Sequence, residues 1–193
     1  MSKQKGELLI KNESVERIFD WYLNSQFVVN RKYQRKLVWK LDEKQLLINS
    51  IANDYPIPLF LLAKNNENYE IIDGMQRLEA IFSFIGGRYP ITVDGAKGYF
   101  DLATMAKTKE MLDGGKIEQK KPILDRGICV SISSYQLPLS ISIAPSKYIE
   151  EVFRRINSTG RRLSDQDLRQ AGVIGDFSNL VRHLACFVRR DSS

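Results

Sequence analysis

The sequence predicts an α+β domain, in which short strands and amphipathic helices follow one another along the chain. The clearest observation is the stretch Tyr69 to Arg88. It starts as a β-branched strand that runs to Ile72, and from Met75 onward its apolar residues take helical spacing until Gly86-Gly87. A second observation is the continuous apolar run Leu59 to Ala63, which is typical of a buried strand. We expect these two strands to pair as an antiparallel hairpin.

The remaining elements follow from local patterns. Further strands are expected at residues 27–29, 89–93, 123–133 and 136–143, and Pro138 in the last of these favours a sheet edge. Residues 96–121 carry only a weak helical pattern. Helices are expected after Ser14, after the capping-box pattern Asp42 to Gln45 with Leu46, Leu47 and Ile51 in its stripe, after Ser146, after Ser164, and from Phe177 to Val188.

Composition narrows the class of protein. The chain has 193 residues, of which 43% are hydrophobic and 27% charged, and no apolar run approaches the roughly 18 residues of a membrane helix. We expect a reduced, cytoplasmic protein without a secretory signal or a membrane partner. Two cysteines and one histidine do not favour a zinc site. The net charge of +6 permits nucleic acid or nucleotide binding, but the basic residues are spread along the chain, which favours a solvated surface.

The junction between the Tyr69 strand and the following helix is the first candidate site. Free backbone N–H groups and the helix dipole favour an anion at such a junction. Gly74 allows close backbone approach, and Arg77 is suited to hold a phosphate or a carboxylate. Two structural alternatives stay open: Asp73 caps the helix, or Arg77 pairs with Asp73 or Glu70.

Two other polar stretches are candidates for ligand contacts. The basic segment Arg31 to Lys36, just before Trp39, is either a solvated charge run or a nucleotide contact that combines charge with stacking. The loop Asn157 to Arg162 contains small hydrogen-bond donors and charges, and Asn157 is alternatively a helix C-cap.

Three segments of the sequence together resemble a known family. They are YQRKLVW (Tyr33 to Trp39), IIDGMQRLEAI (Ile71 to Ile81) and FRRINSTGRRLSDQDLR (Phe153 to Arg169), and the proline pair of YPIPLF matches as well. They are similar to the N-terminal domain of GmrSD-type modification-dependent restriction proteins, within the ParB/sulfiredoxin-like superfamily. We expect that domain over residues 1–172 and a C-terminal helix, the start of a further region, over residues 173–193.

The resemblance implies a small mixed sheet surrounded by helices and a nucleotide site at the strand-to-helix turn. It also implies binding and Mg²⁺-dependent hydrolysis of a nucleoside triphosphate, with an HNH-type nuclease domain or partner protein and DNA as further partners, in phage defence. The residues it would assign to catalysis are Asp73, Gln76 and Arg77, with Asp73 also the metal ligand. Those it would assign to nucleotide binding are Gln34, Arg35, Gly74, Arg77, Asn157, Ser158, Thr159 and Gly160.

One position departs from the family pattern. The family turn is DGQQR, whereas this chain has DGMQR, with Met75 in place of the first glutamine. If that amide contacts nucleotide or water, hydrolysis is weakened; if the side chain packs, methionine is a mild change. The alternative function is a non-catalytic sensor of DNA or nucleotide that regulates a partner nuclease. A nuclease activity of this chain itself is disfavoured, because the sole histidine, His183, has no HNH context.

Overall fold

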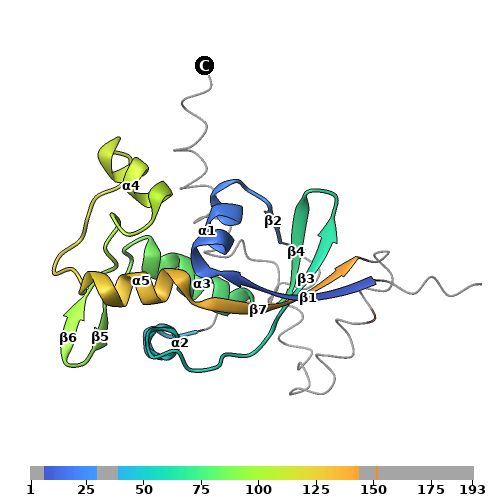
Figure 1. Cartoon of the computed structure of the whole chain (residues 1–193), viewed down its shortest axis with the longest axis horizontal. Helices are drawn as coiled ribbons and strands as arrows, with labels where there is room; N and C mark the ends of the chain where they lie inside the picture. The colour runs from blue at the N-terminus through green and yellow to red at the C-terminus, as the bar shows by residue number, and fades with distance from the viewer. Residues whose placement is uncertain (1–6, 30–38, 144–150, 152–193) are drawn as a thin grey trace, which may run out of the picture.

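A computed structural model describes residues 7–29, 39–143 and 151 of the chain (Figure 1). Within these residues a five-stranded sheet is accompanied by five helices and a separate two-stranded hairpin. The elements in chain order are β1 (Glu7–Ser14), α1 (Val15–Leu23), β2 (Phe27–Val28), α2 (Leu41–Ala52), β3 (Phe60–Asn65), β4 (Asn68–Asp73), α3 (Met75–Ile85), β5 (Ile91–Val93), β6 (Ala96–Gly98), α4 (Ala106–Asp113), α5 (Arg126–Ser134) and β7 (Gln136–Ile143). The expected α+β class is therefore confirmed.

The five-stranded sheet is mixed, with the strand order β1-β7-β3-β4-β2. The pairs β1–β7 and β3–β4 are antiparallel, whereas β7–β3 and β4–β2 are parallel. The small sheet pairs β5 with β6 in antiparallel fashion. In Figure 1, β3 and β4 lie at the right of the view and the β5–β6 hairpin lies at the far left. The mixed sheet that the resemblance implied is present.

Helix α3 lies at the centre of the fold. Residues 77–85 are all buried, so this helix has no solvent-facing side over that length. Phe82 shows how it is enclosed, because its ring stacks on Tyr22 of α1 and meets the edge of Phe19. A helix buried all round must provide partners for any polar residue it carries, because an unpaired buried polar group is costly. That requirement governs the candidate site.

Most of the local predictions are confirmed. Ser14 caps α1, and its side chain accepts a hydrogen bond from the Arg17 N–H at 3.1 Å. The β3–β4 hairpin forms as predicted, with Asn65 paired to Asn68 across the turn. Helix α3 begins at Met75, and its C-cap is Gly86.

The expected strand at residues 123–133 is wrong, because most of it is helix α5. Its β-branched residues favoured a strand, but Asp125 caps a helix there by accepting the Gly127 N–H at 2.7 Å. Cys129 and Ile132 then share a buried face of that helix. Burial against the other helices outweighs the strand propensity of these residues.

The predicted edge position of residues 136–143 is also wrong. Strand β7 is internal, and β1, which the sequence patterns did not reveal, forms the edge beside it. Pro138 is tolerated because pairing with β3 starts one residue later, at Leu139.

Helix α2 begins earlier than its capping pattern suggested. Its N-cap is Lys40, whose backbone N–H donates to the Glu43 carboxylate at 2.8 Å, so the pattern from Asp42 to Gln45 is not the cap. Leu46 is exposed, and the buried stripe is instead Leu47, Ile48 and Ile51.

Several predictions lie outside the described residues. They concern the segment 31–36, the helix after Ser146 apart from Glu151, which is helical, the loop 157–162, the helix after Ser164, the helix from Phe177 to Val188, and His183. The domain boundary at residue 172 lies there too. None of the helices in the described part of the chain is long and apolar enough to cross a membrane.

Candidate functional site

The candidate site lies where β4 ends and α3 begins. Asp73 is the last residue of the strand, and Gly74 is the N-cap of the helix in the left-handed conformation, with φ of 98°. A Cβ atom at position 74 would lie 2.4 Å from Cδ1 of the fully buried Phe60. Both the positive φ and this close approach require glycine, so the turn brings the backbone tightly against β3.

Arg77 holds the turn in place through its guanidinium group. Its Nη2 donates to Asp73 Oδ2 at 2.8 Å and to the Leu59 carbonyl at 3.2 Å, and its Nη1 donates to the Pro58 carbonyl. The guanidinium carbon lies 4.4 Å from the centroid of the Phe60 ring. Arg77 is only 9% exposed, and this burial lowers the pKa of its guanidinium, while the Asp73 charge opposes that shift. Both terminal nitrogens of the guanidinium are therefore engaged, by the Asp73 carboxylate and by two backbone carbonyls.

Asp73 lies on the solvent side of the same ion pair. Its side chain is 52% exposed, and among the described residues only Oδ2 is engaged, by Arg77. The alternative in which Asp73 caps the helix is wrong, because Gly74 occupies the N-cap and no side-chain cap bond is made there. The alternative in which Arg77 pairs with Asp73 describes the geometry. Asp73 is thus a half-exposed carboxylate with a fixed orientation at the start of a helix.

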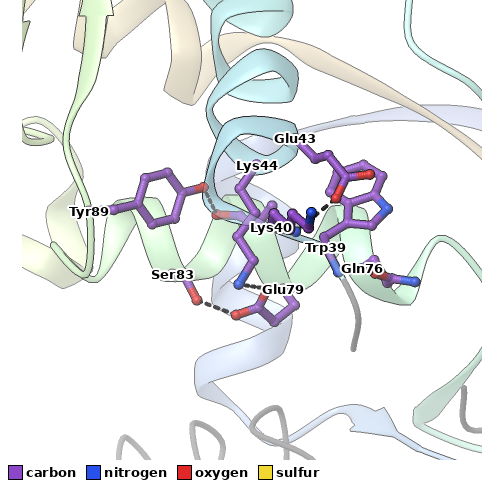
Figure 2. Close-up of polar contacts among 9 residues, drawn as sticks. Trp39, Lys40, Glu43, Lys44, Gln76, Glu79, Ser83 and Tyr89 are labelled. Carbon is purple, nitrogen blue, oxygen red and sulfur yellow. Dashed lines mark hydrogen bonds and ion pairs between the residues drawn. The ribbon is translucent and has the colours of Figure 1, made fainter. Parts of the chain in front are cut away.

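Gln76 joins α3 to the residues before α2. Its Oε1 accepts a hydrogen bond from the Trp39 backbone N–H at 2.8 Å, and both residues are labelled in Figure 2. Trp39 itself is partly buried and packs against the core. Trp39 is the third residue after the basic segment Arg31 to Lys36. The bond therefore holds the chain just after that segment at the first turn of α3. Its partner is 37 residues away in the sequence, so no local pattern predicted it.

A buried ion pair between α2 and α3 was also missed by sequence reasoning. Lys44 Nζ lies 2.7 Å from Glu79 Oε2, and Ser83 Oγ donates to Glu79 Oε1 at 2.7 Å (Figure 2). Glu79 is 5% exposed. The available signal was Glu79 itself, a charged residue within the apolar stretch from Leu78 to Ile85. With Gln76 one turn earlier, this pair fixes α2 against α3.

The structure brings together four of the predicted site residues: Asp73, Gly74, Gln76 and Arg77. Gln34, Arg35 and Asn157 to Gly160 lie outside the described residues. Met75 is partly buried and packs against the core.

The described residues contain no cluster of three or more metal-ligating side chains. Magnesium, however, is commonly held by one or two carboxylates together with substrate phosphates and water, and the half-exposed Asp73 carboxylate fits that role.

Comparison with known families finds one match. Residues 15–174 match the family described as the N-terminal domain of GmrSD restriction endonuclease, a span that covers most of the chain and includes all four of these site residues. No curated protein matched the chain. The family match agrees with the resemblance carried by the three sequence motifs.

Proposed function

Because the chain belongs to the GmrSD restriction endonuclease N-terminal domain family, we propose that it is the nucleotide-binding and nucleotide-hydrolysing module of a DNA restriction system. The nucleoside triphosphate binds at the β4–α3 junction, with its phosphates at the N-terminus of α3. Hydrolysis regulates an HNH-type nuclease domain or partner protein that acts on phage DNA. The described residues contribute the turn, a carboxylate and the anchor of the basic segment.

The observation that carries this proposal is the state of Asp73. Arg77, itself held by two carbonyls and the Phe60 ring, fixes one carboxylate oxygen, while half of the side chain stays exposed. An oriented carboxylate at the N-terminus of a helix is suited to polarise a water molecule next to a bound phosphate.

Each residue of the junction then has a distinct role. Asp73 accepts a hydrogen bond from the attacking water, and Gly74 permits the tight turn against Phe60 that places Asp73 at the start of α3. Arg77 is a positioning residue that acts through Asp73, since its donors already meet Asp73, Pro58 and Leu59. Mg²⁺ bound with the nucleotide would be held by Asp73 and would neutralise phosphate charge.

The described residues on both sides of the basic segment contact β4 or α3. Upstream, β2 pairs in parallel with β4, with Val28 opposite Glu70. Downstream, Trp39 is bonded to Gln76. Gln34 and Arg35 lie outside the described residues and stand five and four residues before Trp39 in the sequence. This closeness in sequence supports their assignment as phosphate and base contacts.

The test is phosphate release from each nucleoside triphosphate in the presence of Mg²⁺. Asp73→Asn keeps the size of the side chain and removes its charge, so turnover should fall by roughly 10² or more while nucleotide binding persists. The matched control is Asp113→Asn, which removes the acid of another Asp–cation pair spaced four residues apart, on the surface of α4. Equal turnover in wild type and Asp73→Asn would refute the site, as would equal loss in both variants.

A non-catalytic sensor is the second candidate, and the engagement of Arg77 favours it. A phosphate at the turn would have to displace Asp73 or two backbone carbonyls to reach that guanidinium. Calorimetry with a triphosphate and Mg²⁺ separates the two candidates. Saturable binding without phosphate release in wild type would establish the sensor, and release that depends on Asp73 would exclude it.

A further inference from the structure

The outer strand β1 is an unusually exposed apolar edge. It spans eight residues without proline and, within the described part of the chain, pairs on one side only, with β7. Its consecutive residues Leu8, Leu9 and Ile10 are 58%, 45% and 69% exposed. Natural edge strands are usually short, charged or interrupted by proline, because a free row of N–H and C=O groups templates pairing with another strand. β1 carries none of these protections over residues 8–10.

The apolar residues of β1 lie on both faces of the sheet. Leu9 is opposite the buried Ile141, on the face that carries the helices, whereas Leu8 and Ile10 are opposite Ser142 and Ser140 on the other face. A single helix or ligand packed on one face would cover only one of these sets. A strand added to the edge covers both, because its side chains also alternate between the two faces.

The sequence of this edge is complementary to itself when it is paired in the antiparallel direction. Around Leu9 the residues read Glu7-Leu8-Leu9-Ile10-Lys11. If Leu9 of one copy faces Leu9 of another, Glu7 faces Lys11, and Leu8 faces Ile10. Opposite charges and apolar pairs directly across a two-stranded ladder are the favourable cross-strand combinations.

Contacts within the chain hold the Lys11 side chain on one face of this edge. Its Nζ lies 2.6 Å from Glu13 and 5.1 Å from the centroid of the Trp21 ring, which keeps the ammonium on the helix face of the sheet together with Leu9. Glu7 lies on that same face, since residues 7, 9 and 11 alternate with 8 and 10. In the antiparallel pairing the exposed Glu7 of a second copy therefore meets Lys11 on the correct face.

We propose that β1 is a self-association edge, through which two copies of the chain pair in antiparallel fashion about a two-fold axis at Leu9. The five strands that the structure describes in each copy then join into one sheet of ten. Such an interface is isologous, because each copy supplies the same strand. Its apolar contact is small compared with that of obligate dimers, so the association depends on concentration.

The experiment is sedimentation equilibrium of the full chain over a wide concentration range. Wild type should show a reversible monomer–dimer equilibrium, and Ile10→Lys should raise the dissociation constant roughly tenfold or more, because each substitution changes two symmetry-related pairs. Leu46→Lys is the matched control, since Leu46 is 68% exposed on α2 and lies away from the edge. A wild-type chain that stays monomeric at every concentration, or a dimer that is equally weakened by both variants, would overturn the proposal.

The register is tested by a charge exchange. Glu7→Lys and Lys11→Glu alone should each weaken the dimer, because each places like charges opposite one another across the ladder. The double variant E7K/K11E restores opposite charges in the proposed register and should recover most of the wild-type affinity. Circular dichroism confirms that each variant is folded. Failure of the double variant to recover affinity, with all variants folded, would refute pairing centred on Leu9.

Discussion

Replacing Arg77 by methionine tests whether this residue mainly supports the fold. Methionine keeps an unbranched apolar stem, but it leaves the Pro58 and Leu59 carbonyls and the Asp73 carboxylate without their donor. Each lost hydrogen bond costs about 0.5–1.5 kcal/mol, and the lost contact with the Phe60 ring costs about 1 kcal/mol. Pro58 and Leu59 are exposed residues and Asp73 is half exposed, so water replaces part of the lost donors and the total should be about 2–3 kcal/mol of unfolding free energy.

The companion change Asp73→Asn should be far milder. Asparagine retains an oxygen that accepts from Arg77, and the lost charge is half exposed, so the loss should be about 1 kcal/mol or less. Urea denaturation of wild type and both single variants measures the difference. Equal losses in the two variants, or a loss below about 1 kcal/mol for Arg77→Met, would show that the guanidinium is not the anchor inferred from its contacts.

This asymmetry decides how activity measurements must be interpreted. A loss of turnover in an Arg77 variant has two causes that cannot be separated, a displaced turn and a missing phosphate contact. Asp73→Asn leaves the turn nearly intact, so its loss of turnover reports on the chemistry alone. The Asp73 variant is therefore the informative one.

Two further predictions concern Gly74, at the start of α3, and Tyr89, which follows α3 in the sequence. Gly74→Ala should cost about 2–4 kcal/mol in urea denaturation, because its Cβ would combine a strained positive φ with overlap on Phe60; a loss below about 1 kcal/mol would contradict the geometry. Burial raises the pKa of the Tyr89 hydroxyl above its ordinary value of 10.0, and the negative charge of Glu79 adds to this shift. As pH rises above 10, the unfolded chain therefore loses this proton before the folded chain does, and the free energy of unfolding falls. Tyr89→Phe should make the decline of unfolding free energy shallower by about 1.4 kcal/mol per pH unit, and an unchanged slope would contradict a raised pKa.

The sequence predicted the parts of the fold that local patterns specify. The change from alternating to helical spacing placed the β4–α3 junction, because a strand, a glycine with positive φ and a buried helix each leave a local signature there. Ser14, as the N-cap, likewise marked the start of α1. These are the elements on which the candidate site depends.

The failures occurred where tertiary packing opposes local preference. Residues 126–134 are rich in residues that favour strands, yet they form α5 because that helix buries Cys129 and Ile132. β1 gave no alternating pattern, since its residues 8–10 are apolar on both faces and stay exposed. The apolar residues on both faces that hid the strand from pattern analysis are also what favours it as a surface for self-association.

For the site, the sequence predicted which residues would meet but not what they would bind. Asp73, Gly74, Gln76 and Arg77 do lie together, as expected. The acceptors of Arg77 are carbonyls 18 and 19 residues upstream, and the donor to Gln76 is 37 residues upstream. Such contacts depend on how β3 and α2 pack, which no single stretch of sequence encodes.

The charge balance at the junction indicates where a triphosphate must find its cations. Arg77 and Asp73 neutralise each other, and Lys44 is neutralised by Glu79, so the described ion pairs at α3 leave little net positive charge. The helix dipole supplies only about half a unit charge. The basic segment has four Arg and Lys residues between Arg31 and Lys36 and precedes Trp39, whose N–H is bonded to Gln76, so we take it as the source of the missing positive charge. Nucleotide affinity should therefore depend on Arg35 more strongly than on Arg77 once stability is accounted for, and calorimetric titration of Arg35→Ala and Arg77→Lys tests this order. A larger loss of affinity in a folded Arg77→Lys would return the phosphate contact to Arg77 and overturn this assignment.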